Sequence, residues 1–477
     1  MRRRGTMADS IARQFARWAA NLKYEDLPPE VVDKVKSLIL VHLVSAVHGA
    51  QSPAAKKAVA FVKREEGKAD GATIIWDGGK ATRIGATFAN SEEIRALEDS
   101  YRMITHPGKS LIPAALVNAE LEGKSLKEMI TALAAGYEFH CRLAYDFVPA
   151  VAARGYRPAP IFHTMGAAVV AAKLMDLDEE RMKAAIAIAA DCASGLFQSG
   201  TERGGGEGGG SVHDTNAARQ GVFAAMVARE GDIKGPEYMI EGPAGFYNAF
   251  TGNNKGVLQY KFDGPSTVDL ADIPKDLGRT WKLLTIMYRM YSTGGYNHQV
   301  INLLVELRER HKIDPDEIAV VEVLMNYLET LYPSPNFPGD PDNKARVGST
   351  HYFAAHAIVN GGYPQLGGRT YGPTGDDLQH DQRVLDFMNT RVKVIGMYDK
   401  PMFSPSITVK MRDGRSYSGD YPYERMQWNF DGLVERLQDL RAKFPLGPGG
   451  LDALIEAMRS AEQMPSVAPL FALTRPR

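Results

Sequence analysis

The chain has 477 residues, 44% of them hydrophobic, and a formal net charge of −1 at pH 7, which is typical of a globular protein of two or three domains. This balance gives no reason to expect nucleic acid or a membrane surface as a partner. The sequence contains neither C-x-x-C nor H-E-x-x-H, so a zinc site is disfavoured.

Helical periodicity dominates the chain from residue 10 to about residue 270. The first residues, MRRRGTMADS, are basic but lead into an amphipathic helix and not into an apolar signal core, so we expect a cytoplasmic protein. Ser52 and Pro53 are the expected N-cap and first residue of a helix that ends at Glu66. Alanine-rich segments predict further helices, packed against one another, at 27–50, 110–123, 127–148, 166–173, 178–197 and 215–229. One short strand is predicted at 72–76.

The pattern changes after about Pro274. Runs rich in β-branched residues predict strands at 318–326, 390–399, 406–412 and 415–421, with a hairpin turn at Asp413–Gly414. Helices are expected at 300–311 and 348–361, and helical periodicity returns after Tyr423. The predicted fold is therefore mainly α: an all-helical domain of residues 1–270 plus 406–477, with a smaller α+β lid domain inserted at 271–405.

His106 stands just before the predicted helix SLIPAALVNAELEG, within the segment ALEDSYRMITHPGK. A helix N-terminus attracts anions and disfavours a cationic imidazole, so His106 is a candidate neutral proton acceptor. The acidic stretch Glu98, Asp99 and Ser100 lies shortly upstream. The alternative is a helix-capping histidine that follows a solvated acidic loop.

Two further segments offer positive and titratable groups. GYRPAPIFHTMG contains Arg157, which binds carboxylates but is a poor base, and His163, which is either a titratable site residue or a core histidine. GTERGGGEGGGSVHDTNAARQG contains Arg203 and His213 on either side of the glycine run 204–210. That run is either a substrate loop or a plain flexible loop.

The segment MYRMYSTGGYNHQVINLL supplies Arg289 and His298, and Lys282 precedes it. An arginine at position 289 can hold a carboxylate but cannot donate a proton. His298 begins the next predicted helix and either contacts substrate or only caps that helix.

These segments, in this order, resemble the MmgE/PrpD family, which includes 2-methylcitrate dehydratases, cis-aconitate decarboxylases and an iminodisuccinate epimerase. Positions 98–100 and His106 fall on the family's acidic loop and H-P histidine. His213 matches the histidine of K-x-[LH]-H-x-G-x-A-A, and Arg289 and His298 fall on a lysine and a histidine of the family. Departures occur at Arg157, where relatives usually have histidine, and at Gly210, where they usually have lysine.

The resemblance implies an active site in the cleft between the helical domain and the lid, a homodimer, and chemistry without a cofactor. In that chemistry a base removes a proton next to a carboxylate, and positive groups stabilise the resulting enolate-like charge. We expect a lyase on a small carboxylic acid, foremost a dehydratase of the 2-methylcitrate dehydratase type with an altered substrate. A decarboxylase or epimerase on the same scaffold and a non-catalytic acid-binding protein are the alternatives.

The residues and the resemblance together give two groups of site candidates. The catalytic candidates are His106, His163, His213 and Asp99. The substrate-binding candidates are Glu98, Ser100, Arg157, Arg203, Arg289, His298 and Lys282.

Overall fold

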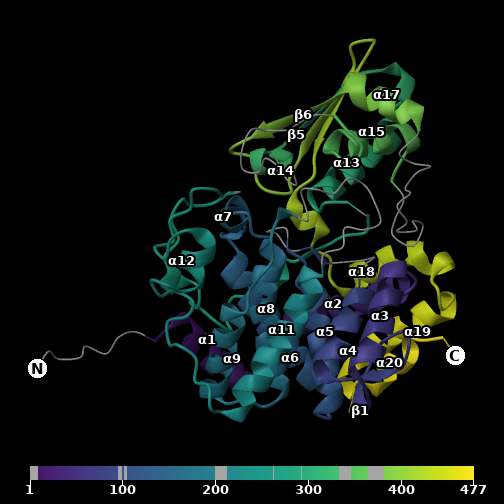
Figure 1. The fold of residues 1–477 in the computed structure, drawn as a ribbon. Helices are drawn as coiled ribbons and strands as arrows, with labels where there is room; N and C mark the ends of the chain where they lie inside the picture. The colour runs from purple at the N-terminus through teal and green to yellow at the C-terminus, as the bar shows by residue number, and fades with distance from the viewer. Residues whose placement is uncertain are drawn as a thin grey trace, which may run out of the picture.

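The structure is a computed structural model that describes residues 9–94, 99–100, 105–198, 212–261, 263–291, 293–331, 345–363 and 381–476. Figure 1 shows a large helical part with a smaller α+β part above it. The predicted fold class is therefore confirmed. The helices of the large part that precede the α+β part are α1 (Ile11–Asn21), α2 (Pro29–Gly49), α3 (Pro53–Glu66), α4 (Arg83–Glu93), α5 (Gly108–Leu121), α6 (Leu126–Ala144), α7 (Val148–Ala153), α8 (Pro158–Leu174), α9 (Glu179–Asp191), α11 (His213–Glu230) and α12 (Phe246–Thr251).

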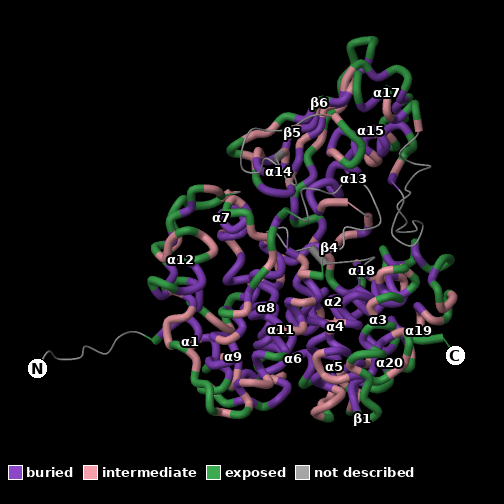
Figure 2. Tube along the Cα trace, in the orientation of Figure 1, coloured by how far each residue is buried: buried purple, intermediate pink, exposed green. Residues whose placement is uncertain are grey.

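Helix α8 is the centre of the helical part. It packs against α5, α6, α9 and α11, and all its residues except Lys173 are buried; Figure 2 shows this core in purple. Small residues allow the close approach, since a Cβ added at Gly221 of α11 would lie 2.4 Å from the Thr164 carbonyl oxygen. A Cβ added at Gly136 of α6 would lie 2.3 Å from Val170 Cγ2. The spacing between these helices is therefore fixed to within the size of a methyl group.

Side-chain caps define several helix starts. The predicted cap at Ser52 is confirmed, because its Oγ accepts a hydrogen bond from Ala55 N. Among the predicted boundaries that differ from the structure, the helix expected at 166–173 begins at Pro158, and the helix expected at 178–197 ends at Asp191. The start at Pro158 agrees with the preference of proline for the first turn of a helix.

Three short strands, β1 to β3, belong to the helical part, and a fourth short strand, β4, comes after α12. β1 (Gly67–Thr73) pairs with β2 (Lys80–Ala81), so the strand predicted at 72–76 starts earlier and ends at Thr73. β3 (Asp99–Ser100) pairs antiparallel with β4 (Met287–Tyr288). This second pairing joins the acidic stretch to a segment almost 190 residues later in the chain.

The α+β part has a four-stranded sheet in the order β6-β5-β7-β8. β5 and β6 are parallel, and the other neighbours are antiparallel. Its elements are α13 (Tyr296–His311), β5 (Ile318–Asn326), α14 (Tyr327–Leu331), α15 (Thr350–Asn360), α17 (Gln382–Arg391), β6 (Val392–Met397), β7 (Ser406–Met411) and β8 (Ser416–Asp420). The predicted hairpin is present between β7 and β8, with Gly414 at φ +87°. The sheet thus continues past residue 405, the predicted end of the inserted domain.

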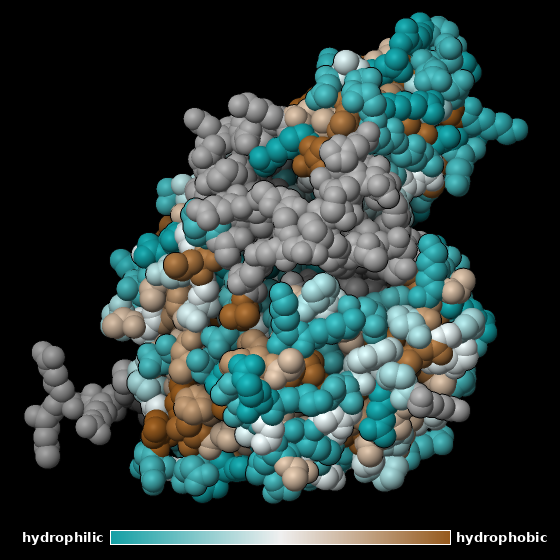
Figure 3. All heavy atoms as spheres, turned by 45° about the vertical axis from the view of Figure 1, so that its right-hand side comes forward, coloured by the Kyte–Doolittle hydropathy of each residue, from teal (hydrophilic) through white to brown (hydrophobic). Residues whose placement is uncertain are grey.

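The C-terminal helices return to the helical part. α18 (Phe430–Leu437) and α19 (Pro448–Arg459) pack against α2, and α20 (Ala468–Leu473) packs against α19; Figure 1 shows these yellow helices beside the purple ones. On the face in Figure 3, the described surface of the α+β part is mainly hydrophilic, whereas the helical part also exposes apolar patches. Within the described ranges, no helix has both the length and the apolar composition needed to cross a membrane.

Candidate functional site

The first turns of three helices meet at one end of the helical core. Ser110 in the first turn of α5 donates a hydrogen bond from Oγ to the backbone oxygen of Asp214 in the first turn of α11, at 2.9 Å. The same Oγ lies 3.1 Å from His163 Nδ1 on α8. Arg157, which immediately precedes α8, reaches Asp214 as well. Because each helix N-terminus carries partial positive charge, their convergence favours an anionic ligand.

His163 is hydrogen-bonded at both ring nitrogens. The Ser110 hydroxyl donates its hydrogen bond to the backbone oxygen of Asp214, so His163 Nδ1–H donates to Ser110 Oγ. His163 Nε2 then accepts from the backbone N–H of His106 at 3.3 Å. Burial, followed by the charge of His140, lowers the pKa of His163 well below its usual value. The neutral ring therefore holds the His106 backbone. A proton-transfer role for His163 does not fit this geometry, because either nitrogen would first have to break a bond.

His106 lies two residues before α5, as the sequence predicts, with a side chain of intermediate exposure. The residues on either side of His106 in the chain pack tightly against the core. The neighbouring Thr105 Oγ1 lies 3.1 Å from His140 Nε2. A Cβ added at Gly108 would lie 2.1 Å from His42 Nε2, so only glycine fits at that position. His106 thus sits on a rigid turn at the edge of the buried core.

Asp214 is the negative centre of the cluster. Its carboxylate is 8% exposed, with Oδ2 3.4 Å from Arg157 Nη2 and 3.9 Å from His213 Nε2. Burial alone would raise the pKa of Asp214, but Arg157, Lys109, His213 and His163 together lower it well below the usual range. Asp214 therefore stays ionised, and the structure brings the predicted residues His106, His163, Arg157 and His213 together around it.

A second group of predicted residues lies on the β3–β4 pair. Asp99 is opposite Tyr288 in the register, so the backbone of the acidic stretch runs beside the residue before Arg289. Arg289 Nη1 donates to the Thr293 carbonyl oxygen at 3.2 Å. The pairing thus brings the backbone of Asp99 and Ser100 next to the Arg289 segment.

His298 supports that segment from within the protein. Its Nε2 accepts hydrogen bonds from Met290 N at 3.1 Å and Tyr291 N at 2.9 Å, and its Nδ1 lies 3.4 Å from the Gly294 carbonyl oxygen. Burial, with the charge of Arg289, lowers the pKa of His298 to about 3. His298 is therefore a neutral residue that shapes the loop, and substrate contact does not fit because both nitrogens face backbone groups.

Of the remaining predicted residues, the structure describes Lys282 but not Glu98 or Arg203. Lys282 Nζ lies 3.9 Å from the centroid of the Tyr145 ring, so an aromatic face stabilises its charge. Glu98, Arg203 and the glycine run 204–210 lie outside the described residues. Among the described residues, no group of three or more His, Cys, Asp or Glu side chains is placed to hold a metal ion.

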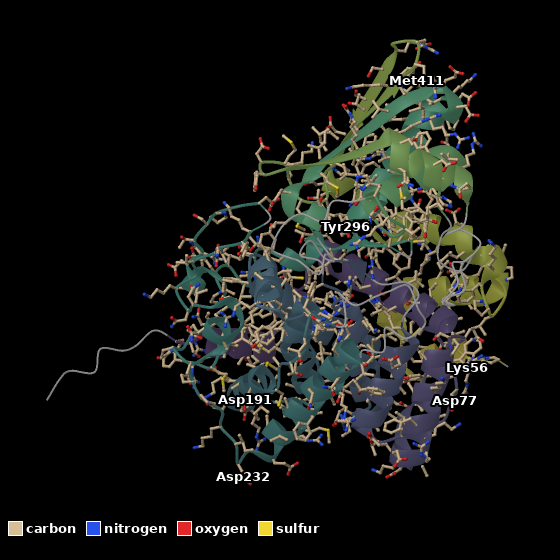
Figure 4. The ribbon with its side chains drawn as sticks, turned by 45° about the horizontal axis from the view of Figure 1, so that its top comes forward. Lys56, Asp77, Asp191, Asp232, Tyr296 and Met411 are labelled. Atoms are coloured by element: carbon tan, nitrogen blue, oxygen red, sulfur yellow. The ribbon has the colours of Figure 1, made fainter. Side chains whose placement is uncertain are left out.

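A groove of about 600 Å³ lies elsewhere on the helical part. It is lined by residues from the end of α2, α3, the turn after β1 and the end of α4, among them Lys56, Asp77 and Glu93. Figure 4 shows Lys56 and Asp77 at the edge of the molecule, whereas Tyr296, at the start of α13, lies at the junction with the α+β part. The groove contains neither His106 nor Asp214, so its lining is separate from that of the candidate site.

A comparison with protein-family models finds a match over most of the helical part. The MmgE/PrpD N-terminal domain matches residues 13–259, which is more than half of the chain. The chain belongs to the MmgE/PrpD family. Curated relatives include a cis-aconitate decarboxylase-like protein, oryM, of Aspergillus oryzae, which is 27% identical over 66% of this chain and 64% of its own length. The cis-aconitate decarboxylase of Aspergillus terreus is 25% identical over 63% and 61% of the two lengths, and that of Homo sapiens is 26% identical over 52% and 51%.

The chain thus matches less than two thirds of the length of these MmgE/PrpD relatives. The names of the relatives support a lyase at the level of the family.

Sequence reasoning missed Asp214 and Lys109. A signal existed for Lys109: a lysine in the first turn of a helix opposes the helix dipole, which indicates an acidic partner nearby. Asp214 directly follows His213, but only the packing of α11 against α8 reveals that its partner is Arg157. The spacing between the two residues carries no such information.

Proposed function

We propose that this chain is a cofactor-free lyase that eliminates water from a small hydroxy-carboxylic acid. The observation that carries the proposal is the convergence of the first turns of α5, α8 and α11, which brings Lys109, Arg157 and His213 around Asp214 and places the His106 backbone against His163. This arrangement combines a candidate base with groups that stabilise negative charge on a carboxylate.

In the proposed reaction, a His106 ring nitrogen takes the proton from the carbon next to a substrate carboxylate. The electron pair left behind is delocalised onto the carboxylate oxygens, and the cationic groups and helix N-termini stabilise that charge. A carbon–carbon double bond then forms as the neighbouring carbon–oxygen bond breaks. The hydroxyl group leaves as water, with a proton supplied by His213. Asp99 stays a candidate catalytic residue.

Decarboxylation is the second candidate, because the relatives named above are cis-aconitate decarboxylases and a decarboxylase-like protein. The same cationic groups would stabilise the carbanion that remains after loss of carbon dioxide, and His106 would return a proton to it. Epimerisation would use the same base without any loss of mass. A non-catalytic acid-binding protein would produce none of these changes.

Mass-resolved product analysis of a panel of hydroxy acids and unsaturated acids separates these outcomes. Loss of water supports the proposal, whereas loss of carbon dioxide or inversion without mass change replaces it by the alternative reaction. His106→Ala should keep the fold and lower turnover by roughly 10²- to 10⁴-fold, the usual contribution of a general acid or base. Full turnover in this folded variant would contradict the role of His106.

A further inference from the structure

One oxygen of the Asp214 carboxylate has no hydrogen-bond partner within the described part of the chain. Asp214 is buried, and its Oδ1 accepts no hydrogen bond from the described residues, while Oδ2 faces Arg157 and His213. An ionised carboxylate is an acceptor only, and leaving such an atom unsatisfied in a buried place is unfavourable. A donor from a ligand would remove that penalty.

The Asp214–Arg157 pair differs from a structural ion pair in the same helical core. Glu138 Oε1 contacts Arg142 Nε at 2.5 Å, and Glu138 Oε2 accepts from Leu283 N at 3.0 Å. The other nitrogens of Arg142 bind the carbonyl oxygens of residues 273, 275 and 280. In that pair both carboxylate oxygens are satisfied, as buried charges require. The contact between Asp214 and Arg157 joins Oδ2 to Nη2 at 3.4 Å. Among the described residues, the second carboxylate oxygen of Asp214 therefore lacks the hydrogen bond that its counterpart in Glu138 has.

We propose that Asp214 Oδ1 accepts a hydrogen bond from a substrate donor, a hydroxyl or an ammonium group, on the carbon adjoining the one that loses its proton. This inference rests on the proposed function and names the substrate class of that site. A substrate carboxylate near Arg157 and Lys109 places its neighbouring donor against Asp214. A carboxylate in place of the donor would meet the like charge of Asp214, so a substrate with a carboxylate at that position is disfavoured.

Binding of three matched dicarboxylates tests the inference without turnover. Malate, aspartate and succinate share a carbon skeleton and differ in carrying a hydroxyl, an ammonium group or only hydrogen at the second carbon. Calorimetric titration of the wild-type protein should show malate or aspartate binding roughly 10- to 100-fold more tightly than succinate, the range of one hydrogen bond to a charged group. Tighter binding of malate identifies the hydroxyl, and tighter binding of aspartate identifies the ammonium group.

Asp214→Asn should remove or reverse this preference. Arg157 attracts the amide oxygen, which leaves the amide NH₂ at the position of Oδ1, and an NH₂ group donates where the carboxylate accepted. Asp232→Asn makes the same chemical change just beyond the other end of α11, at an exposed position labelled in Figure 4, and should leave the preference unchanged.

Equal affinity of the wild-type protein for the three ligands, or no affinity for any of them, would overturn the inference. Retention of the wild-type preference by a folded Asp214→Asn variant would overturn it as well. Because the readout is binding, the selectivity can hold even if His106 proves not to transfer the proton, so the two proposals fail separately.

Discussion

Replacing His163 by glutamine or by asparagine separates its two hydrogen bonds. The amide of glutamine occupies the position of His163 Nε2 and keeps an acceptor for the His106 backbone N–H, which that nitrogen binds at 3.3 Å. The amide of asparagine occupies the position of Nδ1, 3.1 Å from Ser110 Oγ, and leaves the His106 N–H without an acceptor. The two variants thus remove one bond each.

The expected effects differ because only one of the bonds fixes the His106 backbone. An unsatisfied buried N–H group costs about 1–3 kcal/mol, so His163→Asn should lose that much free energy of unfolding. A displacement of the base by ~1 Å lowers turnover by about 10²-fold. His163→Gln keeps the acceptor, and its turnover should stay within about 10-fold of the wild type. Its pH–rate profile should keep its shape, because burial already holds the pKa of His163 well below its usual value and the ring stays neutral.

Urea unfolding and steady-state turnover across pH measure both effects on the same preparations. If His163 were the proton-transfer residue, both variants would lose roughly 10²- to 10⁴-fold in turnover. The pH–rate profile would also lose one limb. Such a result in variants with wild-type circular dichroism would refute the positioning role.

Three further predictions concern the stability and assembly of the helical part. Gly221→Ala places a Cβ 2.4 Å from the Thr164 carbonyl oxygen, so an overpacking cost of about 1–3 kcal/mol should outweigh the roughly 1 kcal/mol gained in helix propensity. Gly449 has open space around it, so Gly449→Ala should not destabilise the protein. Thermal unfolding of the two variants tests this difference. Burial raises the pKa of Glu93 to about 8, so the folded protein keeps a proton that the unfolded chain releases near pH 4.5, and stability falls as pH rises through that window. Glu93→Gln should therefore gain about 2 kcal/mol relative to the wild type between pH 6 and pH 8 in urea unfolding, and a pH-independent difference would contradict the raised pKa. We expect a homodimer of about twice 52.3 kDa in light scattering, and a monomer at micromolar concentration would exclude the dimer.

Local patterns predicted the elements that local chemistry determines. The cap at Ser52, the strand 318–326 and the turn at Asp413–Gly414 are all present in the structure. The position of His106 before a helix also followed from the sequence, because the Pro107–Gly108 pair and the apolar run behind it mark a helix start. Such signals depend only on neighbouring residues.

Roles that depend on contacts between distant residues could not be predicted in this way. The sequence left His163 and His298 open between a site role and a structural one, and the structure directs the Nε2 atom of each to backbone N–H groups of residues 106, 290 and 291. A histidine in a sequence does not show whether its acceptor nitrogen meets a substrate or a peptide group. The partner of Asp214 likewise depends on how α11 crosses α8.

The contacts that join the three helix starts have a consequence for folding. Ser110 and Asp214 are separated by 104 positions, and His106 and His163 by 57. Single helices can form in isolation within microseconds, but these contacts require long stretches of chain to close. Recovery of activity during refolding should therefore lag behind recovery of the helical circular dichroism signal. Enzymatic activity is then a measure of correct helix docking, which helix content alone does not report.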